Sequence, residues 1–238
     1  MGIANSISRL TAYYTRHGFG ATMRRAGLAV KRALFSSRMV VFYCDLGKQT
    51  TAPVNIPSSL KVERLRSYAE LSPQDLQGMT SFWNPKEAHR NIRERFDHGA
   101  SLWLIKSGEK LAGYGWTLQG GTIEPHYFPL AQDDVHLFDF HVFPQYRGQG
   151  INPFLVSHIL CNVVGGSGGR AFIEAAEWNE AQLSSLRKTP FRRMGWARKS
   201  AIFHRTIVCW AQNEAVKQVQ KDTQRRNRAS TMASSHEQ

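Results

Sequence analysis

Two glycines and an arginine lie between an apolar stretch and a helical pattern in the middle of the chain. Residues 139–161 read DFHVFPQYRGQGINPFLVSHILC. Glycine lets the backbone adopt positive φ and lets a ligand approach the main chain. A helix that begins directly after Gly148 and Gly150 also offers N–H groups without intrahelical acceptors. The pattern predicts an anion-binding turn, in which the guanidinium of Arg147 can reach a phosphate oxygen.

The stretches on either side predict a strand before the turn and a helix after it. Leu137–Val142 is apolar and aromatic, and Pro144 ends this strand because proline cannot donate to a sheet ladder. Apolar residues recur at helical spacing from Ile151 to Asn162. No Gly-Lys-Ser/Thr triplet follows, and no Gly-x-Gly-x-x-Gly follows the strand. A nucleotide-triphosphate loop and a dinucleotide fold are therefore disfavoured.

The segment Gln145-x-x-Gly148-x-Gly150 resembles the (Arg/Gln)-x-x-Gly-x-(Gly/Ala) signature of the GCN5-related N-acetyltransferases, the GNAT superfamily. The flanking Val142-Phe143-Pro144 and Ile151 are also similar to that family. The resemblance implies that the turn cradles the pyrophosphate of acetyl-CoA, the co-substrate, and that backbone near His141 polarises the thioester. The cofactor-binding residues it implies are His141, Val142, Gln145, Tyr146, Arg147, Gly148, Gln149, Gly150, Ile151 and Asn179.

Asp139 and His141 are the first candidates for proton transfer. They stand two apart on one strand and should point to the same face. A carboxylate beside an imidazole suggests a proton acceptor or an anchor for a substrate ammonium. A structural Asp–His hydrogen bond is the alternative. Glu177, at the end of the following strand, is a third catalytic candidate, and Glu174 a weaker one. His136 shares a side with Asp139 only if a bulge intervenes.

The general acid is left without a candidate. Many family members carry a tyrosine about seven residues beyond an asparagine. Asn179 fits the asparagine position, but Leu186 occupies the tyrosine position. Water could serve instead, or the chain could bind CoA without turnover.

The charge of the chain predicts polyanionic partners. Its 238 residues carry a formal net charge of +13, with lysines and arginines clustered near residues 9–38, 187–205 and 217–228. CoA phosphates, acidic lipid or nucleic acid would suit such a balance. Nucleic acid is the least favoured, because the aromatic residues cluster in apolar runs rather than among the arginines.

The cysteines indicate a reducing, cytoplasmic compartment. There are three, Cys44, Cys161 and Cys209, which are odd in number and widely spaced. They form neither a disulfide framework nor a zinc-ligand pattern, and no metal is predicted. A basic amphipathic helix over residues 21–34 could lie on the inner surface of an anionic membrane, or pack on the protein body.

The pattern of elements predicts an α+β fold with a mixed central β-sheet flanked by helices. The expected order is β-αα-β-β-β-α-β-α-β over residues 60–210, which matches the GNAT topology, with a closing strand at Arg198–Cys209. We expect three parts: a basic N-terminal extension (1–55), a GNAT acyltransferase domain (56–212) and a disordered C-terminal tail (213–238). The loop over residues 120–134 carries His126, Tyr127 and Phe128 in a row, which favours a functional role.

The function implied by the resemblance is acetyl-CoA-dependent N-acetylation of a primary amine on a small molecule. The turn RGQGINPFL, with an aspartate on the strand before it, resembles a bacterial subgroup associated with surface-polysaccharide synthesis, which implies an amino sugar. A protein amine, a polyamine or an amino acid stays open as acceptor. A non-catalytic CoA-binding regulator and a nucleic-acid-binding module are the alternatives. The sequence does not indicate an oligomeric state.

Overall fold

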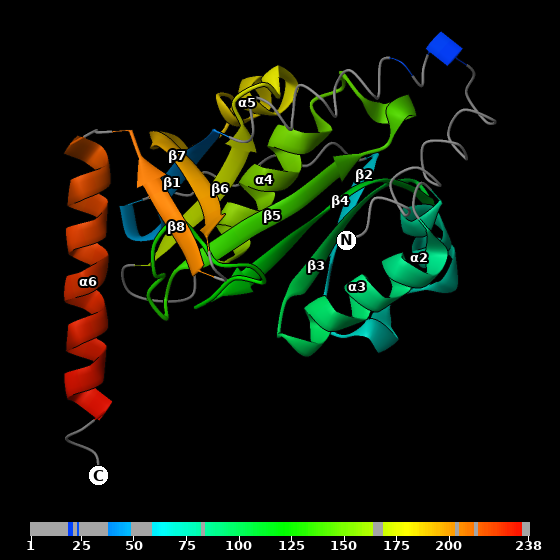
Figure 1. The fold of residues 1–238 in the computed structure, drawn as a ribbon. Helices are drawn as coiled ribbons and strands as arrows, with labels where there is room; N and C mark the ends of the chain where they lie inside the picture. Colours follow the sequence, from blue (N-terminus) through cyan, green and yellow to red (C-terminus); the bar gives the residue numbers. More distant parts are fainter. Residues whose placement is uncertain are drawn as a thin grey trace. The chain divides into compact units, whose positions relative to one another are not determined.

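A computed structural model describes residues 19–20, 23, 38–48, 59–81, 84–163, 169–202, 205–211 and 214–234. The chain divides into two compact units, Met1–Arg38 and Met39–Gln238, and the sheet belongs to the second (Figure 1). The predicted amphipathic helix over residues 21–34 lies outside the described residues, apart from Met23. Its contact with a membrane stays a prediction.

The second unit is built on one eight-stranded sheet with the order β2-β3-β4-β5-β6-β1-β7-β8. The strands are β1 (Met39–Asp45), β2 (Leu60–Leu65), β3 (Ser101–Ser107), β4 (Lys110–Gln119), β5 (Val135–Val142), β6 (Arg170–Ala176), β7 (Arg192–Ile202) and β8 (Arg205–Trp210). Only β5 and β6 are parallel; every other pair is antiparallel. The single parallel pair follows from the helical crossover between its strands.

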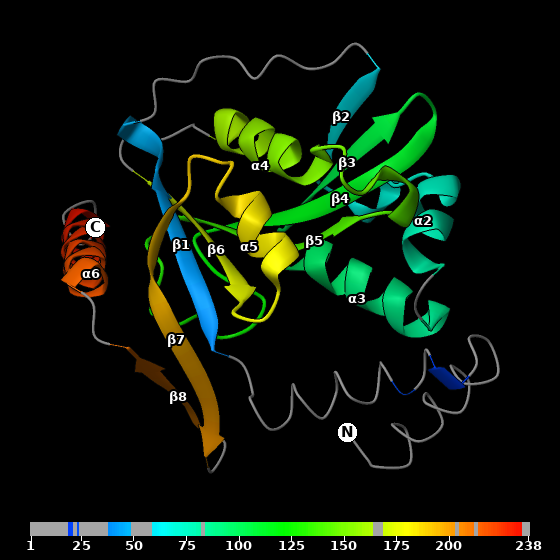
Figure 2. The same ribbon diagram turned by 90° about the horizontal axis from the view of Figure 1, so that it is seen from above.

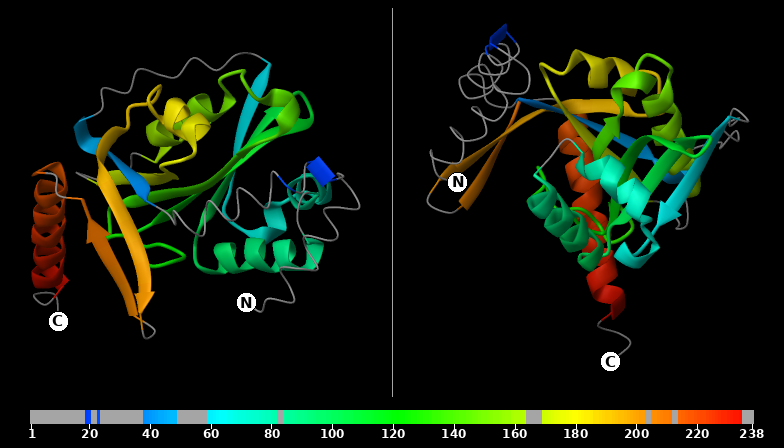
Figure 3. Two further views of the ribbon diagram at one scale, coloured as in Figure 1. Left: turned by 45° about the horizontal axis from the view of Figure 1, so that its top comes forward. Right: turned by 90° about the vertical axis from the view of Figure 1, so that its right-hand side faces the viewer.

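Helices cover both faces of the sheet (Figures 2 and 3). The helices α4 (Ile151–Asn162) and α5 (Glu180–Leu186) pack on one face, and α2 (Pro73–Thr80) and α3 (Pro85–Asp97) pack on the other. Side chains alternate along β3, so Trp103 belongs to the core under α4 while Leu102 and Leu104 belong to the core under α3. The mixed sheet flanked by helices confirms the predicted fold.

The starts of α2 and α3 follow their sequence signals. Ser72 is the N-cap of α2, and its Oγ accepts a hydrogen bond from the Asp75 N–H at 3.1 Å. Asn84 is the N-cap of α3, and its side chain accepts a hydrogen bond from the Lys86 N–H at 3.1 Å. Both helices then begin with a proline, at Pro73 and Pro85.

The strand β1 corrects the predicted boundary between extension and domain. It lies inside the sheet, where it pairs with β6 and with β7. Its residues alternate between two cores: Val40 and Phe42 pack under α4, and Val41 packs on the opposite face. A strand buried on both faces needs the near-continuous apolar run that its sequence has. The boundary therefore falls at Arg38/Met39 rather than at residues 55/56.

The C-terminal region also differs from the prediction. The expected single closing strand is the antiparallel pair β7–β8. Residues 213–238 were expected to be a disordered tail, but the described part of this stretch forms the helix α6 (Glu214–Ser234). Val216 and Val219 of α6 are buried, and Arg226 donates to Asp134 at 2.8 Å. Two valines and a few ion pairs are enough to dock a helix whose composition is otherwise polar.

Candidate functional site

The glycine turn lies between β5 and α4, as predicted. After β5, a short 3-10 helix (Pro144–Tyr146) leads to Gly148 and Gly150, and α4 begins at Ile151. Gly148 has a φ of 78° and Gly150 a φ of 75°. Residues other than glycine rarely adopt these φ angles, so both positions favour glycine.

The glycines also leave open space beside the turn. A Cβ atom added at Gly148 or Gly150 would meet no protein atom within 4 Å. These glycines are therefore not required to avoid a clash within the protein. The space beside the main chain is available to a ligand, which fits the predicted CoA pyrophosphate.

The start of α4 supplies donors to that space. The first helical hydrogen bond runs from the Phe154 N–H to the Gly150 oxygen at 3.1 Å. The earlier N–H groups of an α-helix have no intrahelical acceptor and carry a partial positive charge. Pro153 has no N–H, so Ile151 and Asn152 are the helical residues that offer one.

Several other predicted cofactor residues support the turn. The Nε of Arg147 donates to the Val142 oxygen at 3.1 Å, and the Nε2 of Gln149 donates to the Gln145 oxygen at 3.1 Å. Tyr146 packs against the cores on both faces of the sheet. These contacts fix the turn relative to the end of β5.

Asn179, another predicted cofactor residue, caps a helix. It is the N-cap of α5, where its side chain accepts from the Gln182 N–H at 3.3 Å and donates to the Gln182 side chain at 3.1 Å. The structure thus assigns its side-chain hydrogen bonds to α5 rather than to the turn.

The parallel strands β5 and β6 separate next to the turn. They pair only from Val135 to Leu137, although β5 continues to Val142. On its other side, β5 carries a bulge: Phe138 and His141 have partners in β4, but Asp139 and Phe140 have none. Asp139 has a φ of 50°, the one positive value outside glycine among the described residues. On the side of β6, main-chain groups of residues 138–142 thus have no strand partner among the described residues.

Asp139 and His141 both lie on the face covered by α3. Asp139 forms an ion pair with Arg95 of α3, whose guanidinium lies over the Phe138 ring at 5.5 Å. His141 stacks on Tyr114, with ring centroids 5.5 Å apart. The structure therefore brings the two predicted catalytic side chains to one face, but it pairs Asp139 with arginine rather than with His141.

Burial is the main cause of a lowered pKa at His141. Arg147 lowers this pKa further, and Asp139 opposes the shift. The imidazole is consequently neutral near pH 7 and can accept a proton. Glu177, the third predicted catalytic residue, is half-buried in the turn after β6.

Leu186 is buried in the core beneath α4 and cannot act as an acid. The neighbouring Ser185 accepts a hydrogen bond from Asn152 at 2.8 Å, which joins α5 to the start of α4. Leu186 therefore does not replace the tyrosine that many family members carry at this position as a proton donor.

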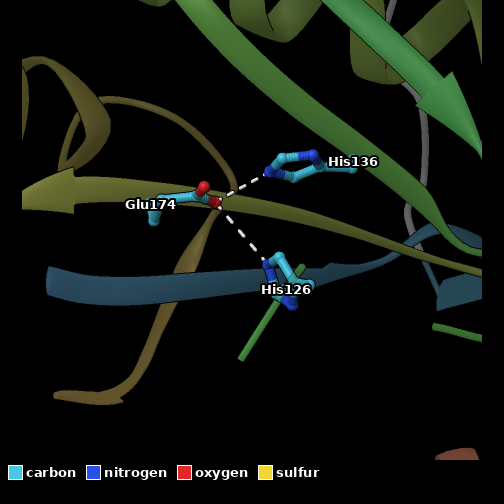
Figure 4. Close-up of side chains that lie close together, drawn as sticks. All are labelled: His126, His136 and Glu174. Atoms are coloured by element: carbon cyan, nitrogen blue, oxygen red, sulfur yellow. Dashed lines mark hydrogen bonds and ion pairs between the residues drawn. The ribbon is translucent and has the colours of Figure 1, made fainter. Parts of the chain in front are cut away.

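A second cluster of polar side chains was only partly anticipated. His126 from the 120–134 loop, His136 from β5 and Glu174 from β6 converge on the face opposite α4 (Figure 4). The Nε2 of His136 lies 2.9 Å from the Glu174 Oε2, and the Nε2 of His126 lies 3.6 Å from the same atom. The β5 bulge lets Phe138, whose ring stacks on His136, share a side with Asp139.

Burial and mutual contacts shift the pKa values in this cluster. Burial lowers the pKa of His126, and Glu174 only partly offsets it. Burial raises the pKa of Glu174, but the two imidazoles outweigh that effect and hold it well below its usual range. The sequence alone could place His126 in a functional loop, but only the β5–β6 register reveals that Glu174 lies beside both histidines.

No helix in the described part of the chain combines the length and the hydropathy needed to cross a bilayer. The search of curated proteins found no match to this chain. A family model described as "Acetyltransferase (GNAT) family" matches residues 65–188, just over half of the 238 residues. This model does not support the narrower surface-polysaccharide subgroup.

Several solved structures are similar to this chain. A GNAT-family acetyltransferase from Colwellia psychrerythraea shares 11% identity at a TM-score of 0.48, over 66% of this chain and 52% of its own. A GCN5-related N-acetyltransferase from Kribbella flavida shares 11% identity at a TM-score of 0.43, over 68% of this chain and 56% of its own. A functionally unknown conserved protein from Staphylococcus epidermidis shares 10% identity at a TM-score of 0.43, over 71% of this chain and 64% of its own. The chain spans about half to two thirds of the length of these proteins.

Proposed function

This chain belongs to the GNAT acetyltransferase family, and from that premise we propose that it transfers an acetyl group from acetyl-CoA to a primary amine of a small molecule. The observation that carries the proposal is the glycine turn. Gly148 and Gly150 hold open space beside the free N–H groups at the start of α4. Such a helix start binds phosphate through its N–H groups and its dipole.

The reaction needs a held co-substrate, a polarised carbonyl and a proton acceptor. The amine nitrogen attacks the thioester carbon, the new C–N bond forms, and the C–S bond breaks to release the CoA thiolate. The amine gives up one proton, and the thiolate takes one from solvent. Main-chain N–H groups in the gap between β5 and β6 would stabilise the carbonyl oxygen as it gains charge.

We assign the proton acceptor to His141. Its imidazole is neutral near pH 7 and lies on the face of β5 that carries Asp139. The ion pair with Arg95 makes Asp139 a poor base and a better positioning residue. Glu177 is the second choice, because it lies at the end of the strand across the gap.

The acceptor that we place first is an amino sugar carried on a nucleotide. The net charge of +13 attracts an anionic substrate and repels a cationic polyamine. A free amino sugar, an amino acid and a protein amine are the other arms of the substrate test.

The test begins with binding. Acetyl-CoA at a hundred times its dissociation constant should stabilise the full chain by about 2.7 kcal/mol in thermal unfolding. The variant Gly148→Val should lose this stabilisation, because its side chain fills the ligand space. The matched control is Gly99→Val, at the end of α3, where φ is 80° and an added Cβ also meets nothing within 4 Å. Both variants carry similar backbone strain, so only ligand binding separates them.

Turnover is tested by thiol release over the amine panel, with His141→Gln as the catalytic variant. At least one amine should raise thiol release in the wild type, and His141→Gln should reduce that rate without changing acetyl-CoA affinity. If acetyl-CoA binds and no amine raises thiol release, the chain is a CoA-binding regulator. If acetyl-CoA does not bind, the proposal fails.

A further inference from the structure

The cluster of His126, His136 and Glu174 has no part in the proposed acyl transfer. It joins three segments: the 120–134 loop, β5 and β6. The side chains of His126 and His136 are only 3% and 8% exposed, and that of Glu174 is 19% exposed. Two imidazoles beside one carboxylate in such a buried place require an explanation.

Hydrogen bonding within the protein does not supply one. Among the residues that the structure describes, neither ring nitrogen of His126 has a hydrogen-bond partner, and the Nδ1 of His136 has none either. A buried polar group without a partner costs about 1–3 kcal/mol. Native structures therefore rarely leave such groups unsatisfied unless water or an ion is bound there. An ion between the three side chains would give the Nε2 of His126 a partner, and water would serve the two Nδ1 atoms.

The distances between the three ligand atoms suit a metal ion. The Oε2 of Glu174 lies 2.9 Å from one imidazole Nε2 and 3.6 Å from the other, and all three atoms lie within 4.8 Å of one another. A tetrahedral zinc ion with bonds of about 2.0–2.2 Å places its ligands roughly 3.3 Å apart. Small rotations about the side-chain bonds would bring the three atoms to that spacing.

We propose that His126, His136 and Glu174 form a Zn²⁺ site that joins the 120–134 loop to β5 and β6. Two histidines and one glutamate are a ligand set that zinc uses in proteins. Three protein ligands leave the fourth position to water or to a ligand group. His126 also lines a pocket of about 360 Å³ with Tyr127 and Phe128, which gives the ion a route to the site. This assignment replaces the prediction that no metal is bound.

The site differs from a simple ion-pair network in one measurable respect. A network of His136, Glu174 and His126 would need no metal and would bind none. Zinc titration of the full chain, after treatment with a chelator, therefore decides between the two. Co²⁺ is the second probe, because its visible absorption is strong in tetrahedral sites and weak in octahedral ones.

We expect one Zn²⁺ per chain and a tetrahedral Co²⁺ spectrum in the wild type. His126→Ala and Glu174→Gln should each weaken Zn²⁺ affinity by at least about 100-fold, since loss of an outer hydrogen-bond partner alone costs about 10- to 100-fold. Glu174→Gln keeps the shape of the side chain and an acceptor for the histidines. His89→Ala, at an exposed position on α3, is the control and should bind Zn²⁺ as the wild type does.

Two results would overturn the site. One is a wild-type chain that binds no Zn²⁺; the other is Zn²⁺ affinity that is equal in the wild type, His126→Ala and Glu174→Gln. If His126→Ala does not fold, Glu174→Gln and the Co²⁺ spectrum of the wild type still decide. The site does not rest on acyl transfer: Gly148→Val should keep its Zn²⁺ affinity, so failure of either proposal is visible without the other.

Discussion

The glycine turn and the histidine–glutamate cluster are two sites built in opposite ways. The turn is one continuous stretch, exposed from Gln145 to Gly150 except at Tyr146, and it offers main-chain N–H groups. The cluster gathers buried side chains from positions 126, 136 and 174, on three separate segments. A main-chain site is conferred by local conformation and a side-chain site by topology.

This difference explains why one site could be predicted and the other could not. The turn requires glycine at fixed spacing, so its chemistry is visible in the order of residues. The cluster depends on the parallel register that sets His136 opposite Phe172 and so places Glu174 just beyond it. Mutations should therefore affect the two sites differently: ligand affinity at the turn, and folding stability at the cluster.

The largest expected effect is on stability, from Glu174→Ala. Removal of the carboxylate takes away the hydrogen-bond partner of His136 and the nearby charge 3.6 Å from His126, which should cost about 3 kcal/mol of unfolding free energy in chelator. Urea unfolding measures this loss, with the exposed Glu109→Ala as control. Acetyl-CoA affinity, measured by calorimetry, should stay within a few-fold of the wild type. A larger loss of acetyl-CoA affinity would mean that the two regions form one site.

Arg226→Ala should come next. Its guanidinium donates to Asp134 at 2.8 Å and to Asp133 at 3.1 Å, and Asp134 is fully buried. Loss of these charged hydrogen bonds should cost about 2 kcal/mol of unfolding free energy. Arg225→Ala, on the exposed side of the same helix, is the matched control. Equal stability of the two variants would show that α6 does not hold the 120–134 loop.

Arg147→Ala tests the turn. It should lower acetyl-CoA affinity by roughly tenfold, equivalent to about 1.4 kcal/mol, through loss of a phosphate partner and of the contact with Val142. Unfolding free energy should change little, because Arg147 is exposed. Binding at two salt concentrations should show a weaker salt dependence in the variant than in the exposed control Arg90→Ala. An unchanged affinity and salt dependence would remove Arg147 from the phosphate site.

The smallest effect is the pH dependence from His141. Its pKa in the folded chain lies below the ordinary value of 6.5, so the unfolded chain binds more protons between the two values. The associated stability is present above pH 6.5 and is lost as pH falls through the folded pKa, by at most about 1.4 kcal/mol per pH unit. The value of kcat/KM should rise through the same folded pKa and then level off. His141→Gln should flatten both profiles, and a retained pH profile of activity would assign the base elsewhere.

Much of the fold was predictable because its signals are local. Ser72 and Pro73 mark the start of α2, and Pro144 marks the end of β5, each through the behaviour of one or two residues. From the sequence, the bulge at Asp139 was only a condition: His136 and Asp139 could lie on the same side of the strand only if a bulge came between them. Its existence depends on how β4 and β5 pair, which no single stretch encodes.

The corrections at β1 and at α6 have a common cause. Met39–Asp45 is apolar enough for a central strand, yet its partners β6 and β7 lie more than a hundred residues further along the chain. The helix α6 is polar by composition, and its partners are an arginine on β6 and two aspartates before β5. Contacts with residues far along the chain determine the structure of both segments. Composition alone does not reveal those contacts, so it predicted both segments incorrectly.

The contact between Arg226 and Asp134 has a consequence for biosynthesis. The two residues are 92 positions apart, so the ribosome must add a long stretch of polypeptide after Asp134 before its partner exists. During that interval Asp134 can be held only by its other partners, such as the main-chain N–H groups of Ala131 and Arg170. The ion pairs of Arg226 with Asp133 and Asp134 can therefore form only after α6 has left the exit tunnel.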